Sequence, residues 1–117
     1  MGSWIEGIAW DGAVFWAGSW NERSLYRYNP VSNTVLSTLY VGWPVEGLAA
    51  AGGFMYACVN GVINKCSTTP FTTVASYRVG NAYAAGIAFD GINFWVACRV
   101  GSGESPGAYR IYKVSLP

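Results

Sequence analysis

Short apolar segments recur along the chain, and each is closed by a turn that contains glycine. The clearest examples are residues 7–12, 47–53 and 86–91, which read GIAWDG, GLAAAGG and GIAFDG. Their first glycines lie 40 and 39 residues apart. A period of this size is typical of a repeat architecture, in which each repeat forms one supersecondary unit.

Each repeat continues with the same succession of segments. Glycine in the turn supplies the positive φ that a tight hairpin needs, so a second strand is expected directly after it. The apolar, aromatic and β-branched runs predict second strands at 14–18, 54–58 and 93–98, third strands at 24–30, 62–68 and 109–115, and fourth strands at 34–42 and 72–80. No segment has convincing helical periodicity. The unit is therefore a four-stranded antiparallel meander.

A meander of this length is the blade of a β-propeller. The second strands are apolar on both faces, which suits a sheet enclosed between two other sheets. We expect an all-β protein with three four-stranded antiparallel blades, and we treat residues 1–117 as a single half-propeller domain. The expected blades cover about 7–46, 47–85 and 86–117. Because the third repeat ends after its third strand, the last blade is expected to lack its outer strand.

Equivalent positions in the repeats carry similar residues. Trp16, Tyr56 and Trp95 share one position of the second strand, and we expect them to pack between blades. Two further sets are equivalent in the third strand, namely Leu25, Ile63 and Ile111, and Arg27, Lys65 and Lys113.

Three blades are too few to close a propeller, because closed rings typically contain about four to eight blades. An open stack would leave apolar faces in water at both ends. Two chains joined head to tail give a six-bladed ring, whereas three chains would give nine blades. We therefore expect a homodimer that forms one six-bladed ring, and the sequence offers no visible donor for the missing outer strand.

Composition narrows the choice of partners. Hydrophobic residues make up 52% of the chain and aromatic residues 16%, which is enough for a substantial core. Only 11% of the residues are charged and the net charge is +1, so nothing indicates a nucleic-acid or membrane partner. No apolar run approaches the ~20 residues of a membrane span, and the first residues lack the pattern of a signal peptide. We expect a soluble protein whose compartment is unknown.

Three cysteines and no histidine argue against a zinc site or a disulfide framework. Cys58, Cys66 and Cys98 are expected to be small buried apolar residues. If Asn-Gly at 60–61 forms a two-residue hairpin, Cys66 faces Met55, which is the wrong register for a bridge to Cys58.

The pattern G-[IL]-A-[WF]-D-G-x-x-F-W, followed by L-Y-R-Y-N-P or I-Y-K-V, resembles the blade of six-bladed propellers of the NHL, streptogramin-lyase-like and glutamine-cyclotransferase-like groups. The resemblance covers essentially the whole chain and implies the fold, but one fold hosts many functions. Streptogramin lyases act through histidine, which is absent here. Propeller lactonases hold calcium with Glu, Asn and Asp at the central channel, and only part of such a set is present. No catalytic position of the cyclotransferase group can be matched, and Ala50, Ala51 and Gly52 depart from the repeat pattern.

Candidate binding residues lie in the segments that lead into the first strands, at the expected mouth of the channel. Glu6 and Glu46 directly precede equivalent glycines, while Ala85 occupies the third such position. In a two-fold ring these residues would form a group of four carboxylates, which could take calcium or a cationic ligand, or hold one carboxyl protonated. The simpler interpretation, which we favour, is a pair of rim carboxylates bonded to backbone amides.

Aromatic and polar residues accompany the two glutamates. Trp4, Trp43 and Tyr83 lie in the same segments and could stack on a sugar or another flat ligand, or could cover the blade junctions instead. Asn21 and Arg23 lie in the loop between the second and third strands at the same rim, and loops on a rigid scaffold commonly carry binding residues.

No catalytic constellation is visible. The leading hypothesis is a non-enzymatic binding or scaffold module that assembles into a closed ring and binds a small ligand, a carbohydrate or a protein at the channel or rim. One alternative is an enzyme of the lactonase or cyclotransferase type that uses Glu6 or Glu46. Another is an isolated or engineered half-propeller that assembles but has no evolved ligand.

Overall fold

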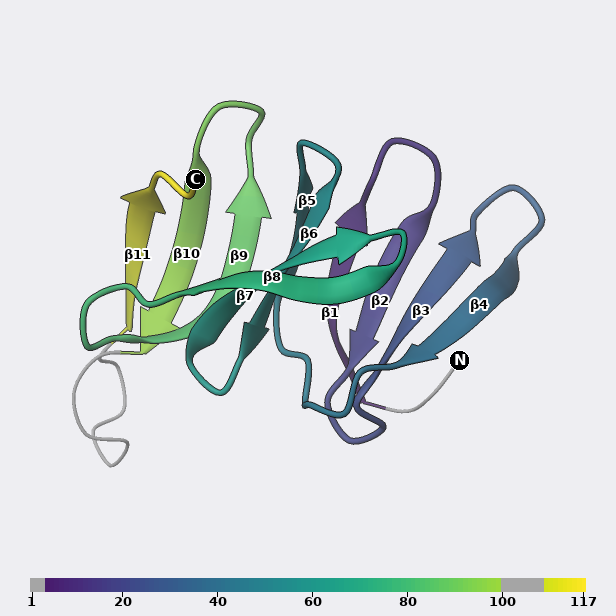
Figure 1. Cartoon of the computed structure of the whole chain (residues 1–117), viewed down its shortest axis with the longest axis horizontal. Helices are drawn as coiled ribbons and strands as arrows, with labels where there is room; N and C mark the ends of the chain where they lie inside the picture. Colours follow the sequence, from purple (N-terminus) through teal and green to yellow (C-terminus); the bar gives the residue numbers. More distant parts are fainter. Residues whose placement is uncertain (1–3, 100–108) are drawn as a thin grey trace.

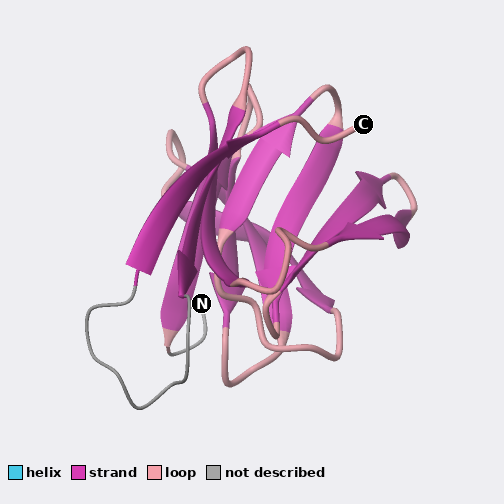
Figure 2. Cartoon of the chain, turned by 90° about the vertical axis from the view of Figure 1, so that its left-hand side faces the viewer, coloured by secondary structure: helices cyan, strands magenta, loops and turns pink. Residues whose placement is uncertain are grey.

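A computed structural model describes residues 4–99 and 109–117, and within these residues the chain forms eleven strands and three antiparallel sheets (Figure 1). The strands are β1 (Ile5–Trp10), β2 (Phe15–Ser19), β3 (Ser24–Asn29), β4 (Thr34–Tyr40), β5 (Leu48–Ala51), β6 (Phe54–Val59), β7 (Val62–Thr68), β8 (Phe71–Tyr77), β9 (Tyr83–Phe89), β10 (Phe94–Arg99) and β11 (Tyr109–Val114). Figure 2, viewed from the end of the third sheet, shows only strands and loops in the described part. That part contains no helix long and apolar enough to cross a membrane.

Each sheet is a meander of consecutive strands. The first sheet has the order β1-β2-β3-β4, the second β5-β6-β7-β8, and the third β9-β10-β11. The three sheets follow one another along the long axis of the molecule, with the second between the other two (Figure 1). The expected strand order is therefore confirmed for the described residues, and the third sheet has three strands there.

Two-residue turns set the register of the second sheet. Asn60 and Gly61 have φ values of 50° and 82°, as a type I′ turn requires, and Val59 pairs with Val62 across them. Cys66 consequently pairs with Met55, as expected from the sequence. The Gly52–Gly53 turn between β5 and β6 has similar φ values of 58° and 83°.

The three sheets align position by position. Trp16 pairs with Arg27, Tyr56 with Lys65, and Trp95 with Lys113. The neighbouring pairs place Leu25, Ile63 and Ile111 at one further shared position, so all three predicted sets of equivalent residues are correct. Hereafter, residues are called equivalent when they occupy the same position in this alignment.

Two hydrophobic cores fill the spaces between neighbouring sheets. The first core joins Trp16 and Leu25 of the first sheet to Met55 of the second. The second core joins Tyr56 and other residues of the second sheet to Phe94 of the third. Trp16 and Tyr56 are each 4% exposed, which confirms their expected packing between sheets.

The inner strands approach one another backbone to backbone through glycine. A Cβ atom built on Gly7 would lie 2.6 Å from the carbonyl oxygen of Glu46, and one built on Gly47 would lie 2.9 Å from that of Ala85. Both distances are too short for a side chain. The glycines that begin the sequence repeat are therefore required where neighbouring sheets meet.

Two details differ from the sequence-based expectation. Trp95 is 41% exposed, because the described chain provides no sheet beyond β9-β10-β11 to cover it. Glu6 and Tyr83 lie inside strands β1 and β9 and not in loops, because backbone pairing continues past an irregularity in each strand to Ser19 and Arg99.

Candidate functional site at the channel mouth

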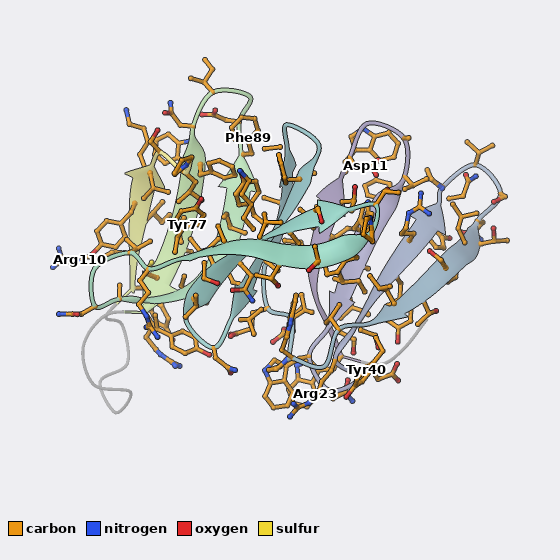
Figure 3. All side chains as sticks on the ribbon, in the orientation of Figure 1. Asp11, Arg23, Tyr40, Tyr77, Phe89 and Arg110 are labelled. Atoms are coloured by element: carbon orange, nitrogen blue, oxygen red, sulfur yellow. The ribbon has the colours of Figure 1, made fainter. Side chains whose placement is uncertain are left out.

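The sheets have two ends with different chemistry. One end, called the turn rim here, carries the β1–β2, β5–β6 and β9–β10 turns (Figure 1). The other end, called the channel mouth, carries the N-terminal ends of β1 and β9, the residues before β5, and the β2–β3 and β6–β7 turns. Figure 3 shows Asp11 at the turn rim, whereas Arg23 and Tyr40 lie at the channel mouth.

Glu46 and Tyr83 meet at the channel mouth. The Tyr83 hydroxyl donates a hydrogen bond to Glu46 Oε1 at 2.8 Å, and the Arg99 guanidinium lies 4.6 Å from the centre of the Tyr83 ring. Burial raises the pKa of Tyr83, and the hydrogen bond and charge of Glu46 raise it further. The Tyr83 ring also lies against the Gly61 turn, so this tyrosine links the third sheet to the second.

Glu6 is exposed on β1, in the position equivalent to Glu46. Within residues 4–99 and 109–117, no group of three or more His, Cys, Asp or Glu side chains could hold a metal ion. A group of four glutamates would be a property of a ring and not of one chain. Calcium binding therefore stays a prediction.

Trp4 forms an exposed aromatic pair with Trp20. Their ring centres are 5.5 Å apart, the Trp20 amide donates to the Trp4 carbonyl oxygen at 3.1 Å, and the side chains are 61% and 42% exposed. Trp20 was not singled out from the sequence. The sequence repeat gives no signal for it, because its equivalent in the third sheet is Arg99, whose cation-π contact with Tyr83 is seen only in the structure.

Trp43 is placed differently from Trp4. It is partly buried and packs against the first core. Its indole therefore serves to cover the junction between the first two sheets, which is the second of the two roles considered for the aromatic residues of these segments.

Asn21 and Arg23 are both engaged in local contacts. The Ser19 hydroxyl donates to Asn21 Oδ1 at 3.0 Å. Arg23 has a φ of 52°, its guanidinium donates to the Gly42 carbonyl oxygen at 3.2 Å, and its own carbonyl accepts from the Val41 amide at 2.9 Å. Arg23 thus fastens the β2–β3 turn to the segment that follows β4.

An aspartate and a tryptophan act as a pair at the turn rim. Asp11 Oδ1 accepts the amides of Ala13 and Val14, both at 2.8 Å, and Oδ2 accepts Trp16 Nε1 at 2.8 Å. Burial acts against ionisation of Asp11, but these hydrogen bonds outweigh it, so the pKa lies below its usual value.

The third sheet repeats this pair. Asp90 accepts the amides of Ile92 and Asn93 and, through Oδ2, Trp95 Nε1 at 2.8 Å. Hydrogen bonds from Asn93, Trp95 and Ile92 lower the pKa of Asp90 to about 2. The second repeat has neither residue, since Ala51 and Tyr56 occupy the two positions. That joint absence is the sequence signal by which the pair could have been recognised.

A cavity of ≈ 330 Å³ opens at the turn rim, lined by Trp10, Asp11, Met55 and Phe89 among others. Its lining is largely apolar or backbone. Both carboxylate oxygens of Asp11 already accept hydrogen bonds within the β1–β2 turn, so this carboxylate stabilises the turn.

The two end sheets expose residues whose equivalents are buried inside the molecule. Ile111 is 72% exposed, whereas its equivalents Leu25 and Ile63 are fully buried. Ile8 is 64% exposed at the other end, whereas its equivalent Leu48 is 3% exposed.

Comparison with known proteins supports the fold. No protein-family model matches the chain, and no curated protein matches it in sequence. The structure is similar to the Pan2 WD40 domain of Neurospora crassa (TM-score 0.69, 9% identity, 93% of this chain and 36% of that one). It is also similar to glutaminyl cyclase of Myxococcus xanthus (TM-score 0.64, 14% identity, 93% of this chain and 49% of that one). A third similar structure is the computationally designed Ika4 protein (TM-score 0.64, 10% identity, 97% of this chain and 68% of that one).

These structural neighbours are β-propeller proteins, and the three antiparallel sheets of this chain match propeller blades. The chain spans about a third to a half of the first two structures. At such identities the likeness shows the fold alone, and the neighbours include both an enzyme and a designed protein.

Proposed function

We propose that this protein is a non-enzymatic binding or scaffold module that closes a six-bladed propeller ring with a second copy of itself. The observation that carries the proposal is the exposure of apolar faces on the first and third sheets, at positions whose equivalents are buried or half-buried at the internal junctions. A ligand, either a small molecule, a carbohydrate or a protein, would bind at the channel or its mouth.

The end faces favour association because covering a large apolar side chain contributes about 1.5–3 kcal/mol. Ile8 and Trp10 of the first sheet and Trp95 and Ile111 of the third are between 41% and 72% exposed. A head-to-tail contact that does not close produces fibres, whereas two copies of three blades reach a typical propeller size.

The channel mouth favours binding or scaffolding over catalysis. Tyr83 donates a hydrogen bond to Glu46, and Arg23 donates one to the Gly42 carbonyl oxygen. These polar groups therefore stabilise the channel mouth itself. A ring would place two copies of the exposed Trp4–Trp20 pair around one channel, where paired indoles offer flat apolar surface to a sugar or another planar ligand.

The proposal is tested by measuring the mass of the purified chain in solution, with sedimentation velocity and light scattering over a hundredfold range of concentration. We expect a folded species with twice the chain mass of 12.6 kDa, which dissociates only on dilution. A well-folded monomer at every concentration would contradict the ring, and so would an open-ended series of larger oligomers.

A further inference from the structure

We infer that the two copies meet in the register of the internal junctions, so that Trp95 of one copy packs on Trp10 and Phe15 of the other while Gly86 lies against the Glu6 carbonyl. This inference rests on the proposed self-association and adds which surfaces meet. Three independent features of the chain support it.

The first feature is an aromatic platform that is already assembled. At the junction of the second and third sheets, the ring centres of Tyr56 and Phe94 are 4.5 Å apart, and those of Phe94 and Phe89 are 4.8 Å apart. Trp10 and Phe15 are equivalent to Phe89 and Phe94, and their ring centres are also 4.8 Å apart. The first sheet therefore presents the same two-ring platform, on a face that no other described sheet of the same copy covers. Trp95 of a second copy could pack on it.

The second feature is the orientation of Trp95. Its indole nitrogen donates to Asp90 Oδ2 at 2.8 Å, just as the buried Trp16 donates to Asp11 Oδ2 at 2.8 Å. Trp16 has this arrangement within a formed junction. Trp95 is therefore held in the docked orientation before docking, which lowers the entropic cost of association.

The third feature is the space left beside Gly86. Its equivalents Gly7 and Gly47 each leave room for a carbonyl oxygen of the next sheet, that of Glu46 or Ala85. A Cβ atom built on Gly86 would meet only Ala97 Cβ, at an ordinary 3.5 Å, among the described residues. The residue that stands in the Ala85 position of the next copy is Glu6.

Same-face contact is the competing arrangement. Two copies could bury Trp95 by pressing their third sheets together, but this would bring Lys113 of one copy toward Lys113 of the other, because Lys113 pairs with Trp95 on the sheet. The head-to-tail register avoids that repulsion.

A disulfide test separates the two arrangements. We expect the double variant Ile5→Cys with Ala97→Cys to form a covalent dimer on a non-reducing gel. Ile5 and Ala97 are equivalent to Val45 and Gly18, which lie directly against each other at the first junction. Neither single variant should form one. The native protein is the control, because Cys58, Cys66 and Cys98 are buried and burial raises the pKa of Cys58 to about 12.

The outcomes also separate this inference from the proposed function. A covalent dimer of Ala97→Cys alone would show same-face contact and overturn the register. A dimer by light scattering in which the double variant does not cross-link would also overturn the register while leaving self-association intact. A native chain that remains a monomer would overturn both.

A glycine pair provides a second test that needs no cross-link. Gly86→Ala adds a methyl group that the chain itself can hold, so it should leave unfolding of the isolated chain unimpaired but raise the dimer Kd by about tenfold to hundredfold. Gly47→Ala is the matched control and should destabilise the chain, because its Cβ would lie 2.9 Å from the Ala85 oxygen. An unchanged Kd for Gly86→Ala would overturn the inference.

Discussion

Asp90 fixes both its own turn and the ring of Trp95. One carboxylate oxygen accepts two backbone amides and the other accepts the indole, so a single residue sets the conformation of the β9–β10 turn and aims an aromatic side chain. Asp11 does the same for Trp16. Part of the sequence repeat is thus explained by a hydrogen-bonded pair and part by packing.

The Asp90 pKa of about 2 leads to a prediction about acid stability. Because the folded state lowers this pKa from 3.8, the carboxylate contributes stability that is complete above about pH 4 and is lost as the pH falls toward 2. We expect Asp90→Asn to flatten the fall in unfolding free energy over this range, as measured by urea unfolding from pH 5 to 2.

Trp95→Phe is the matched control for this prediction. It removes the indole donor but keeps the amide donors of Ile92 and Asn93, so the acid dependence should be only partly reduced. Identical acid dependence in the native protein and Asp90→Asn would show that these hydrogen bonds do not favour the ionised carboxyl.

At the level of elements, the β6–β7 hairpin is coupled to the next sheet through its turn. Gly61 has a positive φ of 82°, and a Cβ atom there would lie 2.7 Å from the Tyr83 ring. The glycine therefore serves two purposes, namely the turn conformation and the close approach of Tyr83.

Gly61→Ala should lower the unfolding free energy by about 1–2 kcal/mol for the left-handed backbone, with a further loss because the Tyr83 ring must move. Gly53→Ala is the matched control, since Gly53 has nearly the same φ, 83°, with nothing within 4 Å of its Cβ position. Urea unfolding measures both, and equal losses would show that the Tyr83 contact adds nothing.

The limits of two strands also depend on tertiary contacts. The sequence predicts first strands that begin near Gly7 and Gly86, but β1 begins at Ile5 and β9 at Tyr83. The glycines are conspicuous in the sequence because they permit close approach between sheets. They do not end the backbone pairing with β2 and β10, which continues past an irregularity.

At the scale of the whole molecule, equivalent residues differ in burial according to their place in the stack. Trp16 has a sheet in front of it and is 4% exposed, whereas Trp95 belongs to the last sheet and is 41% exposed. Both indoles donate a hydrogen bond to an aspartate, and both residues occupy the same position of the second strand in their sheet. Only the presence of a next sheet distinguishes them.

This difference predicts that the same substitution affects folding at one site and association at the other. Trp16→Ala should lower the unfolding free energy of the chain by about 3–5 kcal/mol at any concentration, as for other buried tryptophans. Trp95→Ala should act chiefly on association. Urea unfolding at two protein concentrations, with sedimentation of the dimer, measures both effects, and equal loss for the two variants in dilute solution would contradict the prediction.

Sequence by itself determined the number of blades, the strand order, the Asn-Gly hairpin and the equivalence of Trp16, Tyr56 and Trp95. These features follow from a repeat period and from turn chemistry, which act between residues close in the chain. Only the tertiary structure decided that Tyr83 bonds to Glu46, that Trp4 pairs with Trp20, and which equivalent aromatic residues are covered. Whether a residue is buried depends on whether another sheet lies next to its own. The repeated local pattern is the same in every sheet, so it cannot tell the inner faces of the stack from the faces at its two ends.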